Sequence, residues 1–271
     1  MLVVDEILVN AADNFQRDPS MSTIKIEIKP EENKISVWNN GKGIPIEIHK
    51  GQKCYVPEMI FGQLLTSSNY DDDQKKTTGG RNGYGAKLAN IFSTKFVLET
   101  ADSKAGKHYR QVFTDNMTKT EEPVIKPNAA GLDFTCVTFY PDLKRFKIEG
   151  LDEDTVSLFT KRAYDMAGVT DSKVKVYING KRIEVKNFCD YCDLYLKNEE
   201  NRELPKIIEQ KHERWEVVAS LSDGQFQQVS FVNSISTIKG GTHVNYVTEQ
   251  IVSKVQLALN KKSKKLVLKP H

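Results

Sequence analysis

The sequence predicts an α+β fold in both halves of the chain, on three observations. Apolar residues recur at helical spacing near the start, in residues 5–14, and near the end, in residues 240–259. Between these segments, several short stretches alternate apolar and polar residues, as strands with one buried face do. A shift in composition after residues 142–168 separates the two halves.

The composition is that of a globular protein with a sizeable core. The 271 residues are 39% hydrophobic and 28% charged, with a net charge of +3. No apolar run approaches the roughly 20 residues of a membrane helix, and the opening MLVVDEILVN lacks the basic region of a secretory signal. Of the four cysteines only those in CDYC, residues 189–192, have metal-like spacing, and no second pair accompanies them, so free thiols are expected.

The first predicted helix, DEILVNAADN at residues 5–14, has an unusual polar side. At roughly 100° per residue, four polar residues share that side: Glu6, Asn10, Asp13 and Asn14. The apolar residues opposite them are Val4, Leu8 and Ala11. An ordinary amphipathic surface helix explains this pattern, but a carboxylate with carboxamides also suits a hard cation.

The following elements complete a predicted first domain of residues 1–163. Residues 23–29 and 34–39 alternate as a β-hairpin, and residues 56–68 form a helix with Pro57 in its first turn. Further strands are expected at residues 95–100, 109–113 and 135–141.

A helix at about residues 152–167 is predicted to join this domain to a second one, residues 164–271. The second domain is expected to open with a hairpin at residues 173–185, whose Asn179-Gly180 pair favours a tight turn. Strands follow in residues 214–222 and 227–236, before the final helix.

The turn NNGKGIP, residues 39–45, follows a predicted strand and could hold a heterocycle. Asn39 offers a donor and an acceptor together. Gly41 and Gly43, which flank Lys42, allow the backbone to approach a ligand closely. A plain connecting turn explains the same letters.

The loop GGRNGYGAK, residues 79–87, runs into the apolar LANIF and is predicted to open a helix. Successive backbone N–H groups at a helix start can bind an anion, and Arg81 and Lys87 add positive charge. The spacing fits neither a P-loop nor a dinucleotide-binding motif. A flexible surface loop is the competing interpretation.

With these three pieces the sequence resembles the GHKL ATPases, which include gyrase, MutL, certain heat-shock chaperones and sensor histidine kinases. Within that group it is similar to the ATPase region of eukaryotic type II DNA topoisomerases. The blocks that carry the resemblance are DEILVNAADN, WNNGKGIP, YVPEMIFGQLLTSSNYDDD, TTGGRNGYGAKLANIFSTKF and FQQVSFVNSISTIKGGTHV. It implies a two-layer α/β sandwich of the Bergerat type, with a mixed sheet and helices on one face. A smaller transducer domain, similar to domain 2 of ribosomal protein S5, would follow.

The resemblance also implies roles for particular residues. Glu6 would be the general base, Asn10 the protein ligand of Mg²⁺, and Asn39 the adenine contact. Thr138 would lie at the floor of the pocket, and Ser67, Ser68 and Asn69 would meet the ribose and phosphates. The full set of expected ATP-binding residues is Asn10, Asp13, Asn14, Asn39, Gly41, Lys42, Gly43, Ser67, Ser68, Asn69, Gly80, Arg81, Asn82, Gly83, Tyr84, Gly85, Ala86, Lys87 and Thr138.

The partners implied by the resemblance are Mg-ATP, duplex DNA and a second copy of the chain, in the nucleus. The lysine-rich NKKSKKLVLK, residues 260–269, is the candidate DNA contact through Lys261, Lys262 and Lys264. A solvated, lysine-rich face is the alternative.

Two departures from the family pattern limit the expected activity. No Gln-Thr-Lys loop occurs in the sequence to bring a lysine to the γ-phosphate, and the DNA-cleaving region is absent, so the chain is expected to be a fragment. The loss of that lysine removes charge stabilisation from the transition state. The alternative function is therefore a nucleotide-binding and dimerisation module with little hydrolysis. A histidine kinase is disfavoured because no histidine precedes Glu6.

Overall fold

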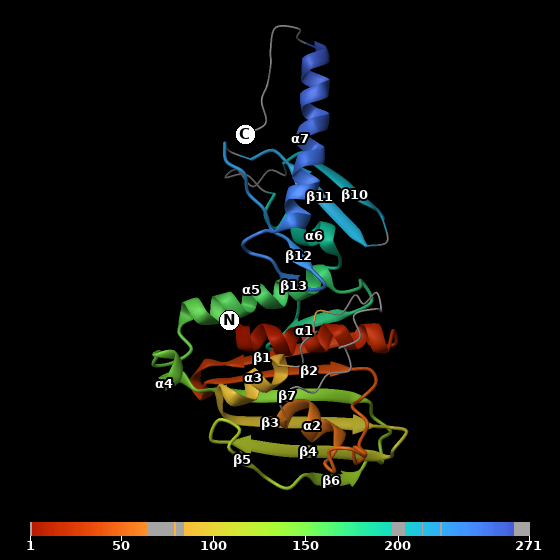
Figure 1. The fold of residues 1–271 in the computed structure, drawn as a ribbon, viewed down its shortest axis with the longest axis vertical. Coiled ribbons are helices and arrows are strands. Elements are labelled where there is room, and N and C mark those ends of the chain that lie inside the picture. The colour runs from red at the N-terminus through yellow and green to blue at the C-terminus, as the bar shows by residue number, and fades with distance from the viewer. Residues whose placement is uncertain are drawn as a thin grey trace.

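The computed structural model describes residues 2–63, 79, 84–196, 204–212, 214–222 and 224–262. Within these ranges a large sheet carries a layer of helices on one face, and a smaller second part extends from that layer (Figure 1). The last helix projects furthest from the sheet (Figure 1). The predicted α+β class, with a mixed sheet covered on one face, is confirmed.

The large sheet has nine strands in the order β5-β4-β3-β7-β2-β1-β8-β9, with β6 also paired to β4. Only the β1–β8 pair is parallel among these described strands. The strands are β1 (Thr23–Lys29), β2 (Lys34–Asn40), β3 (Ser93–Asp102), β4 (Lys107–Thr114), β5 (Lys119–Thr120), β6 (Val124–Pro127), β7 (Phe134–Pro141), β8 (Lys175–Ile178) and β9 (Lys181–Arg182).

The helical layer begins and ends at residues that suit helix ends. Pro57 occupies the first turn of α2, and the side chain of Asp152 caps α5 by accepting from the backbone N–H of Thr155 at 2.9 Å. The helices of the first part are α1 (Leu2–Arg17), α2 (Val56–Gly62), α3 (Gly85–Ile91), α4 (Leu143–Phe146) and α5 (Glu153–Val169), with a 3-10 turn at Pro30–Glu32.

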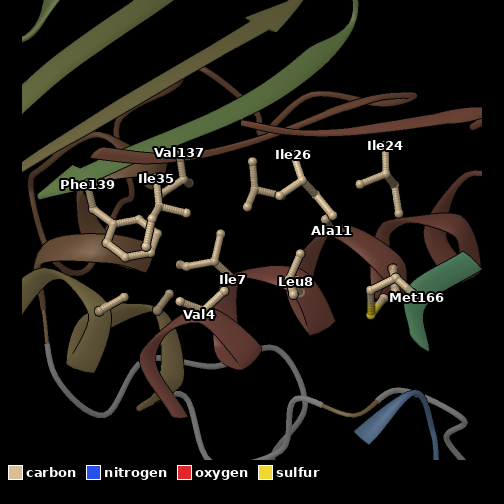
Figure 2. Close-up of a cluster of buried hydrophobic side chains, with 14 of the residues drawn as sticks. Val4, Ile7, Leu8, Ala11, Ile24, Ile26, Ile35, Val137, Phe139 and Met166 are labelled. Carbon is tan, nitrogen blue, oxygen red and sulfur yellow. The ribbon is translucent and has the colours of Figure 1, made fainter. Parts of the chain in front are cut away.

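The core lies between α1 and the sheet, as Figure 2 shows. The apolar side of α1 faces the inward side chains of β1, β2 and β7, and Met166 of α5 reaches the same cluster (Figure 2). Alternation along each strand places every second residue in this core. Because the apolar side of α1 packs into this core, the polar Glu6, Asn10 and Asn14 are left only partly buried.

The second part is built from small elements around α7. These are α6 (Phe188–Asp193), the hairpin of β10 (Lys206–His212) with β11 (Trp215–Ser220), the hairpin of β12 (Phe231–Val232) with β13 (Ile235–Ser236), and α7 (Thr242–Lys262). No helix in the described ranges is both long enough and apolar enough to cross a bilayer.

The structure corrects two expectations about elements. The hairpin at residues 173–185 does not open the second half, because β8 pairs with β1 and extends the large sheet. The single strand predicted at residues 227–236 is instead a short hairpin of residues 231–236, since Asn233 and Ser234 turn the chain with positive φ angles. Of the helix predicted at residues 56–68, the last five residues lie outside the described ranges.

Candidate functional site

The carboxylate of Glu6 lies where α1 meets the beginning of α3. A Cβ atom built on Gly85, the first residue of α3, would come within 1.8 Å of Glu6 Oε2. Glycine at this position therefore lets the Glu6 carboxylate lie directly against the first turn of α3. The packing joins the polar side of the first helix to the end of the glycine-rich loop.

The surroundings of Glu6 favour its protonated form more than water does. Burial raises the pKa of this half-buried carboxyl, and the neighbouring carboxylates of Asp5 and Asp13 raise it further. A carboxylate with a raised pKa is a better proton acceptor than an ordinary surface glutamate. Glu6 is thus suited to take a proton from a water molecule.

The side chain of Asp13 binds the backbone of Gly79, the first residue of the glycine-rich loop. That side chain is 5% exposed, and its Oδ1 accepts from the backbone N–H of Gly79 at 2.9 Å. A Cβ atom on Gly79 would lie 2.5 Å from Val9 Cγ1 and 2.7 Å from the carbonyl oxygen of Asn233. Residue 79 is therefore enclosed between α1 and the β12–β13 turn.

Asn10 is the amide on the same side of α1 with no partner among the described residues. It is half-buried and lies one helical turn from Glu6. Within the described part of the chain, no group of three or more histidine, cysteine or acidic residues could hold a metal ion. A single amide oxygen still fits Mg²⁺ bound to a phosphate ligand, because that ion keeps most of its shell from water and phosphate.

The end of β2, just before the glycine-bearing turn, presents Asn39 on the helical face of the sheet. Asn39 is 4% exposed and pairs in register with Ile24 on one side and Thr135 on the other. Its amide donates to the carbonyl oxygen of Asn40 at 2.9 Å, and the amide of Asn14 donates to the same oxygen at 3.4 Å. The turn is thereby tied to the last turns of α1.

Glycines and two further hydrogen bonds fix this turn. Gly41 has a φ of +90°, and a Cβ atom on Gly43 would come within 1.8 Å of the carbonyl oxygen of Ala101. The exposed Lys42 donates its backbone N–H to Asp18 Oδ2 at 2.7 Å, and Ile44 N–H donates to Thr100 Oγ1 at 2.9 Å.

Gly43→Ala is expected to distort the turn, because its added methyl group meets the backbone of β3. We expect the free energy of unfolding to fall by about 1–3 kcal/mol and the affinity for nucleotide to fall at least about tenfold, or about 1.4 kcal/mol. Chemical denaturation and calorimetric titration measure the two effects. Gly51→Ala is the control, since its Cβ atom would lie 3.5 Å from His49. Equal stability and affinity in both variants would contradict a fixed turn.

The first turn of α3 buries a lysine. Lys87 is 2% exposed, and burial lowers the pKa of its ammonium group to about 8. Ala86 is also buried, whereas Tyr84, immediately before the helix, is 41% exposed. A buried ammonium group is stabilised in its charged form by a nearby anion, which suits a site that receives phosphate.

Thr138 does not join these residues, so its assignment to the pocket floor is wrong. Its hydroxyl lies 2.8 Å from Ser36 Oγ on the opposite face of the sheet, because neighbouring positions of a strand point to opposite faces. Thr135 is the threonine on the helical face: it pairs with Asn39, and its hydroxyl lies 3.2 Å from Thr100 Oγ1. In the sequence, the apolar Val137 marks the buried face of this strand, which Thr135 shares and Thr138 does not.

Several predicted residues lie outside the described ranges. These are Ser67, Ser68, Asn69, Gly80, Arg81, Asn82, Gly83 and Lys264. Lys261 is exposed near the end of α7, and for Lys262 only the backbone is described.

Two families match the chain. The family described as histidine kinase-, DNA gyrase B-, and HSP90-like ATPase matches residues 1–141, and the DNA gyrase B family matches residues 187–269.

Individual relatives match almost the whole chain. A DNA topoisomerase 2 of Pisum sativum is 58% identical over 272 residues, which are 99% of this chain and 19% of the relative. DNA topoisomerase 2-alpha of Gallus gallus is 60% identical over 265 residues, 97% of this chain and 17% of the relative. The crystal structure of the ATPase region of Saccharomyces cerevisiae topoisomerase II has a TM-score of 0.91 and 53% identity, covering 96% of this chain and 68% of that one. The chain thus spans about a fifth of these curated relatives.

Proposed function

The chain belongs to the family of histidine kinase-, DNA gyrase B- and HSP90-like ATPases and is homologous to the N-terminal ATPase region of type II topoisomerases, and we propose that it binds and hydrolyses Mg-ATP as the gate of such an enzyme. In the whole protein, nucleotide binding would close a homodimer and drive the passage of one DNA duplex through another. The contact of the Glu6 carboxylate with Gly85 carries the proposal, because it brings a proton acceptor to the start of a glycine-rich helix.

Each part of the site has a chemical task in this proposal. Glu6 accepts the proton of the attacking water, and Asn10 supplies an amide oxygen to Mg²⁺. Asn39 contacts the adenine edge, with Thr135 beside it in place of Thr138. Lys87 and the backbone N–H groups at the start of α3 stabilise phosphate charge. Phosphoryl transfer depends mainly on such positioning and charge stabilisation.

A calorimetric titration with a non-hydrolysable ATP analogue and magnesium tests nucleotide binding directly. Asn10→Ala is expected to weaken binding of the magnesium complex by about tenfold, since it removes one protein ligand of the ion. Binding without magnesium should change far less. Equal affinities of parent and variant for the magnesium complex would remove Asn10 from the metal site, whereas no binding by the parent would end the proposal.

Steady-state ATP hydrolysis separates this function from its alternative. The chain contains no Gln-Thr-Lys sequence, and a lysine on that loop would stabilise the transition state. Turnover at ordinary enzyme rates would exclude a module that only binds nucleotide and dimerises. Tight binding with negligible turnover would favour that second function.

The lysine-rich end of the chain is proposed to contact duplex DNA, the partner of the whole enzyme. Replacing Lys261, Lys262 and Lys264 by glutamate should flatten the dependence of log K on log salt concentration, by about 0.9 for each DNA phosphate that is no longer neutralised. The control exchanges the exposed Lys104, Lys144 and Lys147, which changes net charge equally. An unchanged salt slope in the first variant would assign those lysines to a solvated face.

We also propose the division of the chain into an ATP-binding part and a transducer part. The boundary is placed after β9 rather than after residue 163, because β8 continues the large sheet. A nuclear location of the whole enzyme is proposed from the family resemblance.

A further inference from the structure

Arg162 in α5 is a buried charge with partners on two different helices. The residue is 1% exposed, its Nε donates to Asp5 Oδ1 at 2.5 Å, and its Nη1 donates to Asp165 Oδ2 at 2.5 Å. Asp5 belongs to α1 and directly precedes Glu6 in the sequence. Arg162 therefore holds α1 at the residue next to the proposed general base.

The contact continues from Asp165 into the second part of the molecule. Asp165 is fully buried, and its Oδ1 accepts from the hydroxyl of Tyr191 in α6 at 2.6 Å. The Tyr191 ring packs against Gly168 of α5, where a Cβ atom would come within 2.5 Å of it, and makes an edge contact with Phe231 of β12 at 5.7 Å between centroids. A continuous series of contacts thus runs from α1 through α5 to α6 and β12.

The chemistry of this series differs from ordinary core packing. A buried ion pair carries a large desolvation cost and often contributes little net stability, while breaking it leaves an uncompensated charge. The guanidinium group presents its donors in a rigid fork, so it can fix two carboxylates relative to each other. Such an arrangement specifies the relative position of α1 and α5 more sharply than the apolar contact of Met166 does.

We infer that Arg162 is a positioning residue that holds the nucleotide-binding helix α1 in a fixed relation to α6 and β12, and that nucleotide binding reaches the second part through Asp5, Arg162, Asp165 and Tyr191. The part of this inference that concerns nucleotide binding rests on the proposed function. Arg162 itself is not placed in contact with nucleotide.

Lys161 provides a matched control from the adjacent position. Its Nζ lies 2.9 Å from both oxygens of Asp165, and its side chain is 43% exposed. Lys161 shares the carboxylate with Arg162, but its described contacts do not reach α1. A purely local role for the charges on Asp165 would make Lys161→Gln and Arg162→Gln behave alike.

The first experiment uses amide hydrogen exchange of the whole chain without nucleotide. Arg162→Gln is expected to speed exchange in both α1 and α6 by about a hundredfold, and Arg162→Lys by less. Asp5→Asn should speed exchange in α1 alone, and Tyr191→Phe in α6 alone. Lys161→Gln should leave α1 within about twofold of the parent. Unchanged α1 exchange in Arg162→Gln, or equal effects of Arg162→Gln and Lys161→Gln on α1, would overturn the inference.

The second experiment adds magnesium and a non-hydrolysable ATP analogue. Binding to the parent should slow exchange in residues 188–193 of α6, whereas Arg162→Gln should bind the analogue within about threefold of the parent's affinity without slowing α6. Binding to the parent with no change in α6 would refute the coupling and leave the nucleotide site intact. If the parent binds no nucleotide, the proposed function fails, and the nucleotide-free comparison still decides whether Arg162 positions α1.

Discussion

Glu6→Gln should reduce ATP hydrolysis by about a thousandfold, within the range that removal of a general base produces. The amide keeps the size of the carboxyl group and its place against Gly85 but cannot accept the proton of the attacking water. Affinity for the magnesium complex of a non-hydrolysable ATP analogue should stay within about threefold, since the change removes an interaction made in the transition state.

Hydrolysis by Glu6→Gln is best measured in single turnovers with protein in excess, so that slow cleavage is still resolved. Glu27→Gln is the matched control: its carboxylate belongs to β1 and pairs with Lys29 and Lys34 at the surface. That variant should hydrolyse ATP like the parent. Parental rates in Glu6→Gln would assign the base to another residue.

The raised pKa of Glu6 adds a pH dependence with a definite sign. A general base acts in its deprotonated form, so hydrolysis is lost as the pH falls through the pKa of Glu6. Because burial and the nearby carboxylates of Asp5 and Asp13 raise that pKa, the loss should begin at a higher pH than for an ordinary glutamate. The acidic limb of the rate profile should disappear in Glu6→Gln, because that variant has no titrating carboxyl group at residue 6.

The buried faces of individual helices and strands could be predicted, because they depend only on the spacing of apolar residues along the chain. The helical period in residues 5–14 correctly separated the buried Val4, Leu8 and Ala11 from the polar side. The strict alternation in residues 23–29 and 34–39 likewise predicted the β1–β2 hairpin. Short-range patterns fix which face is buried, and that was enough to place Glu6 and Asn39 correctly within their elements.

Long-range pairing could not be predicted in the same way. The parallel pairing of β1 with β8 joins one segment that precedes α5 in the sequence to one that follows it. No local pattern in residues 173–185 specifies that partner. The same holds for Asp13, whose acceptor role depends on where Gly79 lies, and for Arg162, which looks like an ordinary charged helix residue in the sequence.

The wrong assignment of Thr138 to the pocket floor had a different cause, because the sequence does show which threonine of β7 faces the core. The apolar Val137 and Phe139 mark the buried side of β7, so Thr135 shares that side and Thr138 does not. A residue role transferred by motif position alone ignores the alternation of the strand. The period of two along β7 selects Thr135.

Gly85→Ala should lower ATP hydrolysis by about a hundredfold, because small misplacements of catalytic groups are costly. The new methyl group would occupy the position of Glu6 Oε2, at 1.8 Å, and the flexible carboxyl end would have to move. Stability should hold or rise slightly, since alanine favours a helix more than glycine does. Thermal unfolding and single-turnover hydrolysis measure the two effects, and a fall in stability with parental hydrolysis would contradict this account.

A double variant shows whether the effect of Gly85→Ala passes through Glu6. If the methyl group acts only by displacing that carboxylate, adding Gly85→Ala to Glu6→Gln should cost no more than about a further threefold, as expected for groups that act as a unit. If Gly85 also lets phosphate approach the first turn of α3, the two losses should multiply and affinity for the ATP analogue should fall as well. The non-additivity of the rates, taken with the analogue's affinity, therefore distinguishes a glycine required by the catalytic base from one required by the nucleotide.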